Sequence, residues 1–169
     1  LGLGLVTTAS AQATCSSLDP IEKDRLSVAW VSPLGAKNAW QSTWIPVVQT
    51  AQLRGALDET GGDLARMLQI LGLRKKSKPP KRRYKVVIFE VSPEYLCRPI
   101  DGVEPDVEVD GQPACLPRLS KAKRNYKGCG FTTDRLDGER GLDLYRTQWR
   151  DAAQSGFCVL PADRFVQGE

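Results

Sequence analysis

The sequence predicts a small single α+β domain with a mixed or antiparallel sheet, two or three helices and a disulfide-stabilised C-terminal half. Three observations support this fold class. One segment has the spacing of an amphipathic helix, another has the composition of a buried strand, and the two kinds of element do not alternate regularly as in a parallel βαβ fold. The length of 169 residues suits one domain. With 41% hydrophobic residues, the chain has the composition of a globular protein.

The first part of the chain holds one short helix signal and two apolar runs. Asp19-Pro20 is typical of a helix start, because a capping residue precedes a proline at the first helical position. Residues 26–30 alternate between large apolar and small residues, which predicts a strand. Residues 43–53 are apolar but include Pro46, which lacks a backbone donor. We therefore expect an edge strand or the entry to a strand there.

The middle of the chain carries the clearest helix and the clearest strand. An apolar stripe with helical spacing runs from Leu64 to Leu71, between a cap at Asp63 and a stop at Gly72. Residues 84–91 (YKVVIFEV) are β-branched and aromatic, with apolar side chains on both faces. A strand that is apolar on both faces is expected to lie inside a sheet.

Three further elements are expected toward the C-terminus. Residues 107–109 alternate with acids and lead into Asp110-Gly111, which predicts a hairpin. The apolar residues of 142–152 have helical spacing, and Gly156 would end that helix. Residues 157–160 predict a short strand.

The N-terminal residues have the pattern of an export signal. An apolar start is followed by small polar residues and by Ala11-Gln12-Ala13, the small-x-small form that signal peptidase cleaves. We therefore expect residues 1–13 to be the remnant of a signal peptide and residues 14–169 to be one domain in the periplasm or outside the cell. The mature part contains no apolar run of about 20 residues, so no transmembrane span is expected.

The five cysteines are expected to form disulfides, because they occur in a chain that carries an export pattern. No two of them form a CxxC pair and the chain has no histidine, which argues against a zinc site. Two bridges are predicted among the four cysteines of the C-terminal half, in any of three pairings: Cys97, Cys115, Cys129 and Cys158. Cys15 is left over, unless it pairs with one of these four and leaves another one free.

Positive charge is concentrated in a proline-containing arm at residues 74–85, which we call the basic segment. Eight of its twelve residues are basic: Arg74, Lys75, Lys76, Lys78, Lys81, Arg82, Arg83 and Lys85. Without them the chain has 16 bases and 20 acids, so this segment accounts for the whole net charge of +4. Pro79-Pro80 favours an extended backbone in its middle.

The basic segment has three alternative interpretations. It could be a solvated connection, which is the ordinary role of a charge run. It could pair with the acidic residues of 101–110, within the fold or between copies. It could also bind an external anionic polymer, an envelope surface or lipid head groups, with nucleic acid an unlikely partner. Trp40 and Trp44, in a polar stretch, form a second candidate contact for carbohydrate or a protein partner.

Enzymatic chemistry is restricted by the absence of histidine. Ser–His and Cys–His mechanisms are excluded in this chain, which leaves paired carboxylates as the acid–base candidates. The candidate carboxylates are Glu90, Glu94, Asp134, Asp137 and Glu139. The oxygen-rich loop at 134–139 leaves calcium as a minor alternative, although the arginines in and beside it favour a self-paired turn. No cofactor motif is present, so neither a cofactor nor a metal is expected.

The sequence thus predicts a small exported binding or structural protein without enzymatic activity, acting on an anionic polymer, a lipid head group or a partner protein. Two alternatives stay open. The first is a secreted hydrolase that uses paired carboxylates. The second is a subunit of an envelope assembly, with the acidic and basic blocks as complementary contacts.

Overall fold

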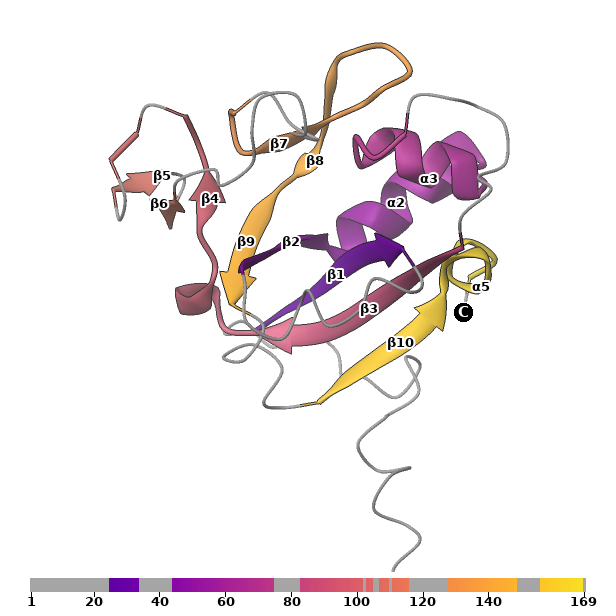
Figure 1. Cartoon of the computed structure of the whole chain (residues 1–169), viewed down its shortest axis with the longest axis horizontal. Helices are drawn as coiled ribbons and strands as arrows, with labels where there is room; N and C mark the ends of the chain where they lie inside the picture. Colours follow the sequence, from indigo (N-terminus) through magenta and orange to yellow (C-terminus); the bar gives the residue numbers. More distant parts are fainter. Residues whose placement is uncertain are drawn as a thin grey trace, which may run out of the picture.

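The computed structural model describes residues 25–33, 44–74, 83–101, 103–104, 107–109, 111–115, 128–148 and 156–168. Within this part, a five-stranded antiparallel sheet has the order β10-β3-β1-β2-β9 (Figure 1). Its strands are β1 (Leu26–Pro33), β2 (Trp44–Gln49), β3 (Tyr84–Val91), β9 (Tyr145–Gln148) and β10 (Phe157–Pro161). The predicted α+β fold class is confirmed.

Three helices contribute to the hydrophobic core on one face of this sheet. They are α2 (Thr50–Thr60), α3 (Leu64–Ile70) and α5 (Ala162–Val166) (Figure 1). Leu53 of α2, Met67 of α3 and Phe165 of α5 are fully buried against apolar residues of the sheet. The predicted helix after Asp63 is confirmed, and the Asp63 side chain accepts a hydrogen bond from the backbone N–H of Arg66.

Strand β3 is buried on both faces, as its composition predicts. Val86 and Ile88 belong to the core on the helix side of the sheet. Val87 and Phe89 belong to a second cluster of buried residues on the opposite face. Because neighbouring side chains of a strand point to opposite faces, this strand joins the two clusters. It pairs with β1 on one side and β10 on the other.

Two small sheets and a short 3₁₀ helix extend this framework. One sheet contains β4 (Arg98–Pro99), β6 (Gln112–Cys115) and β5 (Glu108–Val109), and the other contains β7 (Phe131–Thr133) and β8 (Arg140–Asp143). The 3₁₀ helix η2 (Pro93–Tyr95) leads from β3 toward β4. The predicted hairpin is confirmed as β5–β6, with Gly111 at φ 77° in its turn. Backbone hydrogen bonds of 3.0 and 2.8 Å between Cys97 and Arg146 attach the first small sheet to the edge strand β9.

Two predicted elements differ from the structure: a strand forms within 43–53 but not at an edge, and the helix expected from residue 142 does not form. Strand β2 is not an edge strand, because it lies between β1 and β9, and residues 50–60 continue as helix α2. Pro46 is tolerated since β1 pairs with β2 only at Val48 and Gln49, beyond the proline.

The helix expected from residue 142 is also replaced by strands, β8 and β9. Within β9, Tyr145 and Thr147 are buried while Arg146 and Gln148 are half-buried, so the burial repeats every two residues. Pairing with β2 and with Cys97 overrides the helical spacing of the apolar residues. Residues 149–155 lie outside the described part.

The cysteines confirm one predicted bridge but not a second one among the same four residues; they agree with the alternative in which one of the four pairs elsewhere and another keeps its thiol. Cys97 and Cys115 form a disulfide with a Cα–Cα distance of 5.5 Å, in the C-terminal half. Cys129 keeps its thiol. Cys158 is disulfide-bonded, but not to Cys97, Cys115 or Cys129. The reason is one of placement: Cys158 is buried in the helix-side core, whereas Cys129 is exposed beside β4.

The N-terminal predictions cannot be placed in this fold. The expected signal remnant (1–13), Cys15 and the helix expected at Asp19-Pro20 lie outside the described residues.

Candidate functional site

The structure places both ends of the basic segment on ordered elements. Arg74 follows α3, and its backbone N–H donates to the carbonyl of Leu68 at 3.2 Å. Arg83 is exposed directly before β3, and Lys85 lies within β3 between β1 and β10. The other predicted contact residues of the segment lie outside the described part: Lys75, Lys76, Lys78, Lys81 and Arg82.

The acidic block lies far from these two ends. Its described acids, Asp101, Glu104 and Glu108, are exposed. Figure 1 shows the β5–β6 hairpin, which carries Glu108, at the opposite end of the molecule from the start of β3. The described charges of the two blocks therefore do not pair within one chain.

The predicted tryptophan contact is only half described. Trp44 is half-buried at the start of β2, opposite Gln148 of β9. Trp40 lies outside the described residues.

Asp134, the most buried of the candidate carboxylates, forms an ion pair with Arg66. Both oxygens of Asp134 accept hydrogen bonds from the guanidinium of Arg66, at 2.8 and 2.6 Å. The hydrogen bond from Arg66 holds the pKa of Asp134 below its ordinary value, although burial opposes this shift. Asp134 therefore stays ionised at neutral pH and is a poor general acid.

The remaining candidate carboxylates are dispersed. Glu90 on β3 lies 3.7 Å from Arg25, and Glu94 is exposed on η2. Asp137 and Glu139 are exposed in the turn between β7 and β8. Among the described candidates, the buried Asp134 and the half-buried Glu90 each face an arginine, which is not the arrangement of a glycosidase pair.

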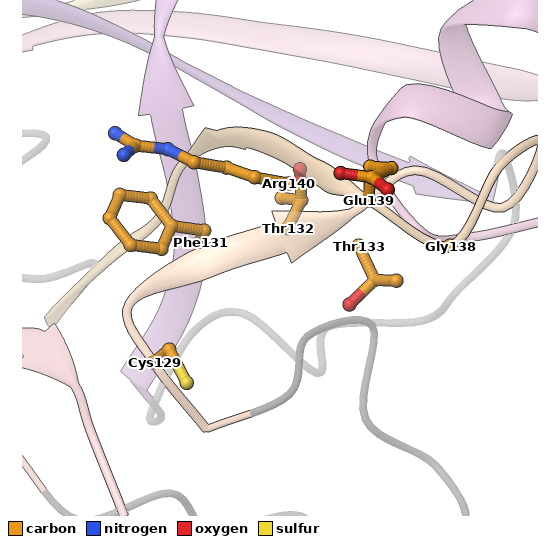
Figure 2. A pocket seen from close by; sticks show the side chains of 7 residues that line it. All are labelled: Cys129, Phe131, Thr132, Thr133, Gly138, Glu139 and Arg140. Carbon is orange, nitrogen blue, oxygen red and sulfur yellow. The ribbon is translucent and has the colours of Figure 1, made fainter.

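A hollow of about 290 Å³ lies at the β7–β8 hairpin (Figure 2). Phe131, Thr132 and Thr133 of β7 line it, together with Cys129, which precedes the strand. Glu139 and Arg140 line it from the other side of the hairpin. The Arg140 guanidinium lies over the ring of Phe131, 3.5 Å from its centroid, as a cation–π contact.

The same hairpin is fixed to the C-terminal end of α3. The Thr132 hydroxyl donates to the carbonyl of Ile70 at 2.7 Å, and the Arg135 backbone N–H donates to the carbonyl of Gln69 at 3.0 Å. Arg135 also donates from Nε to the carbonyl of Gly72 at 3.1 Å. Carbonyls at a helix end lack partners within the helix, so the hairpin supplies them.

Arg98 is a buried cation that the sequence analysis missed. It is 6% exposed, and its Nη2 donates to the Tyr145 hydroxyl at 3.2 Å and lies 3.7 Å from Asp143. Its guanidinium lies 4.9 Å from the ring centroid of Tyr145 and 5.9 Å from that of Phe131. Its Nε and Nη1 are buried without a hydrogen-bond partner. The one sequence signal is its position between a bridging cysteine, Cys97, and Pro99.

The exposed groups of the described residues are ones that can bind other molecules. They contain no group of three or more Cys, Asp or Glu that could hold a metal ion. No helix in the described part is long and apolar enough to span a bilayer. Exposed arginines, an aromatic ring and hydroxyl groups can bind, stack and donate hydrogen bonds.

In comparisons with known proteins, no family model, curated protein or solved structure matches the chain.

Proposed function

We propose that this chain is a binding or structural protein whose basic segment, residues 74–85, contacts a polyanion. The observation that carries the proposal is the concentration of eight bases in twelve residues of a chain that is otherwise net negative. Such a concentration of positive charge attracts anionic polymers and lipid head groups. It gives information about the partners of a protein and not about its fold. An envelope polymer or the head groups of a membrane are the partners proposed.

Three structural observations support this assignment. The segment begins at the hydrogen-bonded end of α3 and ends at the central part of the sheet, so its two ends are held by buried elements. Arg83 is exposed at one of these ends. The β5–β6 hairpin, which carries the exposed acid Glu108, lies at the other end of the molecule from the start of β3, where the segment ends (Figure 1).

An exported location is part of the proposal. The Cys97–Cys115 disulfide and the disulfide of Cys158 support it, because structural disulfides persist in oxidising compartments. The A-x-A pattern at residues 11–13 supports it from the sequence.

Retention on immobilised heparin tests the proposal, with a control of equal charge. In one variant the five bases Lys75, Lys76, Lys78, Lys81 and Arg82 are changed to Gln. In the control the same change is made at the five bases of 118–127 (Arg118, Lys121, Lys123, Arg124 and Lys127). We expect the first variant to elute at much lower salt than the second. Equal elution of the two variants would show that net charge, rather than the segment, governs binding.

A second candidate, a subunit that assembles head to tail, is favoured by the separation of the two charge blocks. The hairpin with Glu108 and the start of β3 with Arg83 lie at opposite ends of the molecule, so the acids of one copy can contact the bases of the next, as a heterologous contact. Sedimentation velocity at low and high salt tests it, and assembly should weaken as salt is added. A monomer at all concentrations and salts would contradict it.

The hydrolase alternative has less support. It needs a buried acid whose proton is available, whereas Asp134 is tied to Arg66.

A further inference from the structure

The hollow at the β7–β8 hairpin is lined by two opposite charges that are held apart. Glu139 and Arg140 both line it, and both are exposed. They are neighbours in the sequence, yet Arg140 forms its ion pair with Asp143 and not with Glu139. Figure 2 shows the Arg140 side chain extending toward Phe131, away from the carboxylate of Glu139. Each charge is therefore open to a ligand in the same hollow.

The positive end of the hollow is a fixed guanidinium. Arg140 stacks on the ring of Phe131 at 3.5 Å, and its Nη2 donates to Asp143 at 2.9 Å. Asp143 also lies 3.7 Å from the buried Arg98, so one carboxylate faces two guanidinium groups and positive charge is in excess. The Arg140 side chain is still 63% exposed. A guanidinium that is already oriented, with N–H groups left for solvent, is suited to bind a carboxylate.

The negative end of the hollow lies at the turn of the hairpin. The Glu139 carboxylate is exposed, and its backbone N–H donates to the side chain of Asp137 at 2.8 Å, so a second carboxylate lies in the same turn. The carbonyl of Glu139 accepts from the backbone N–H of Asp134 at 2.9 Å, which fixes the backbone here. Thr133, which also lines the hollow, adds a hydroxyl. Carboxylates accept hydrogen bonds only, so this end is suited to bind an ammonium group.

We propose that this hollow binds a small zwitterion, with the ligand carboxylate on Arg140 and the ligand ammonium on Glu139. A ligand with one charge is attracted at one end and repelled at the other, whereas a ligand with both charges is attracted at both ends. The hollow has a volume of about 290 Å³, near the lower limit of about 300 Å³ for ligand pockets, which suits an amino acid or a dipeptide. The site lies outside the basic segment and does not depend on polyanion binding.

Isothermal titration calorimetry with four probes tests the match of charges. Alanine and alanyl-alanine carry both charges, N-acetylalanine carries only the carboxylate, and alanine amide carries only the ammonium. We expect one or both zwitterions to bind more tightly than either single-charge probe, and their binding to weaken as salt is added. Failure of both zwitterions to bind, or equal binding of all four probes, would overturn the proposal.

Substitutions at the two charges assign the ends of the ligand. Glu139→Gln and Arg140→Gln should each weaken binding of the zwitterion about tenfold, because each removes one charge-assisted contact. Glu94→Gln, which changes an exposed acid on η2, is the matched control for Glu139→Gln and should bind like the wild type. Heparin retention should be the same in Glu139→Gln and the wild type, which separates this site from the proposed function. Zwitterion binding unchanged by Glu139→Gln would contradict the site.

The thiol of Cys129 gives an independent readout, because Cys129 is exposed and lines the same hollow. Alkylation by iodoacetamide is followed with and without alanyl-alanine, and the modified peptide is identified by mass spectrometry. We expect the dipeptide to slow alkylation of Cys129 in the wild type and to have no such effect in Glu139→Gln. A rate that saturating dipeptide leaves unchanged in the wild type would place the ligand elsewhere and reject the proposal.

Discussion

The five-stranded sheet and the flank formed by β4 to β8 are held together by different interactions. In the sheet, most fully buried side chains are apolar and pack in two clusters, one with Val86 on the helix side and one with Phe89 on the opposite face. The flank depends on single contacts: the disulfide at Cys97, the buried cation Arg98 and the carboxylate Asp134. The sheet therefore draws its stability from burial that many residues share. In the flank, one substitution can remove a whole attachment.

The largest expected effect concerns the sheet. Phe89→Ala should lower the free energy of unfolding by about 3–5 kcal/mol, because a fully buried ring is replaced by a cavity. Val159→Ala, on the neighbouring strand and 38% exposed, is the control and should change it by less than about 0.5 kcal/mol. Urea denaturation measures both. Equal losses would mean that burial does not stabilise this sheet as described.

The next effect concerns the disulfide of the flank. Replacing Cys97 and Cys115 together by Ala should lower the free energy of unfolding by about 3 kcal/mol, because the bridge closes a loop of 18 residues. Cys129→Ala, which leaves every described bridge in place, is the control. Thermal unfolding compares the three proteins, and peptide mapping without reduction should recover Cys97 linked to Cys115. An unchanged midpoint in the double variant would rule out this attachment.

A smaller effect is expected where Arg98 meets Asp143. Asp143 lies 3.7 Å from Arg98 and accepts a hydrogen bond from Arg140 at 2.9 Å. Asp143→Asn should cost about 2 kcal/mol, because a buried guanidinium loses its counter-charge. Arg98→Met should cost less, since it also removes the two nitrogens that lack hydrogen bonds, while Asp143 keeps Arg140. The opposite order in denaturation midpoints would contradict this account of the cluster.

The smallest effect is the pH dependence that Asp134 contributes. Because its pKa is lowered in the folded state, its contribution is present above the unfolded pKa of about 4. The contribution is lost as the pH falls through the lower folded pKa. Asp134→Asn should therefore cost about 1 kcal/mol at pH 7 and leave less change between neutral and acidic pH. Asp137→Asn, an exposed acid of the same turn, should keep the wild-type pH profile.

The same contrast explains which elements the sequence predicted. In β3, apolar residues on both faces come from eight consecutive positions, so local pattern was enough. Helix α2 was missed because only Leu53 and Leu57 of its eleven residues are buried. Strand β9 was mistaken for a helix, because the pairing with β2 joins residues about a hundred positions apart and leaves no local signal.

The candidate sites divide in the same way. The basic segment is a property of composition, and the sequence alone located it. The contact of Arg66 with Asp134 spans 68 positions, and the hydrogen bond from Arg135 to the carbonyl of Gly72 spans 63 positions. Neither could be predicted from spacing, because both arise only when the hairpin packs on the end of α3.

The salt dependence of polyanion binding tests the central claim most directly. Binding of a heparin oligosaccharide is measured between about 50 and 200 mM salt for the wild type and for the variant with Gln at Lys75, Lys76, Lys78, Lys81 and Arg82. If the basic segment makes the contacts, affinity should fall steeply with salt in the wild type, and the variant should bind weakly with a much shallower slope. The same affinity and slope in both proteins would show that the segment is a solvated connection and contradict the proposed function.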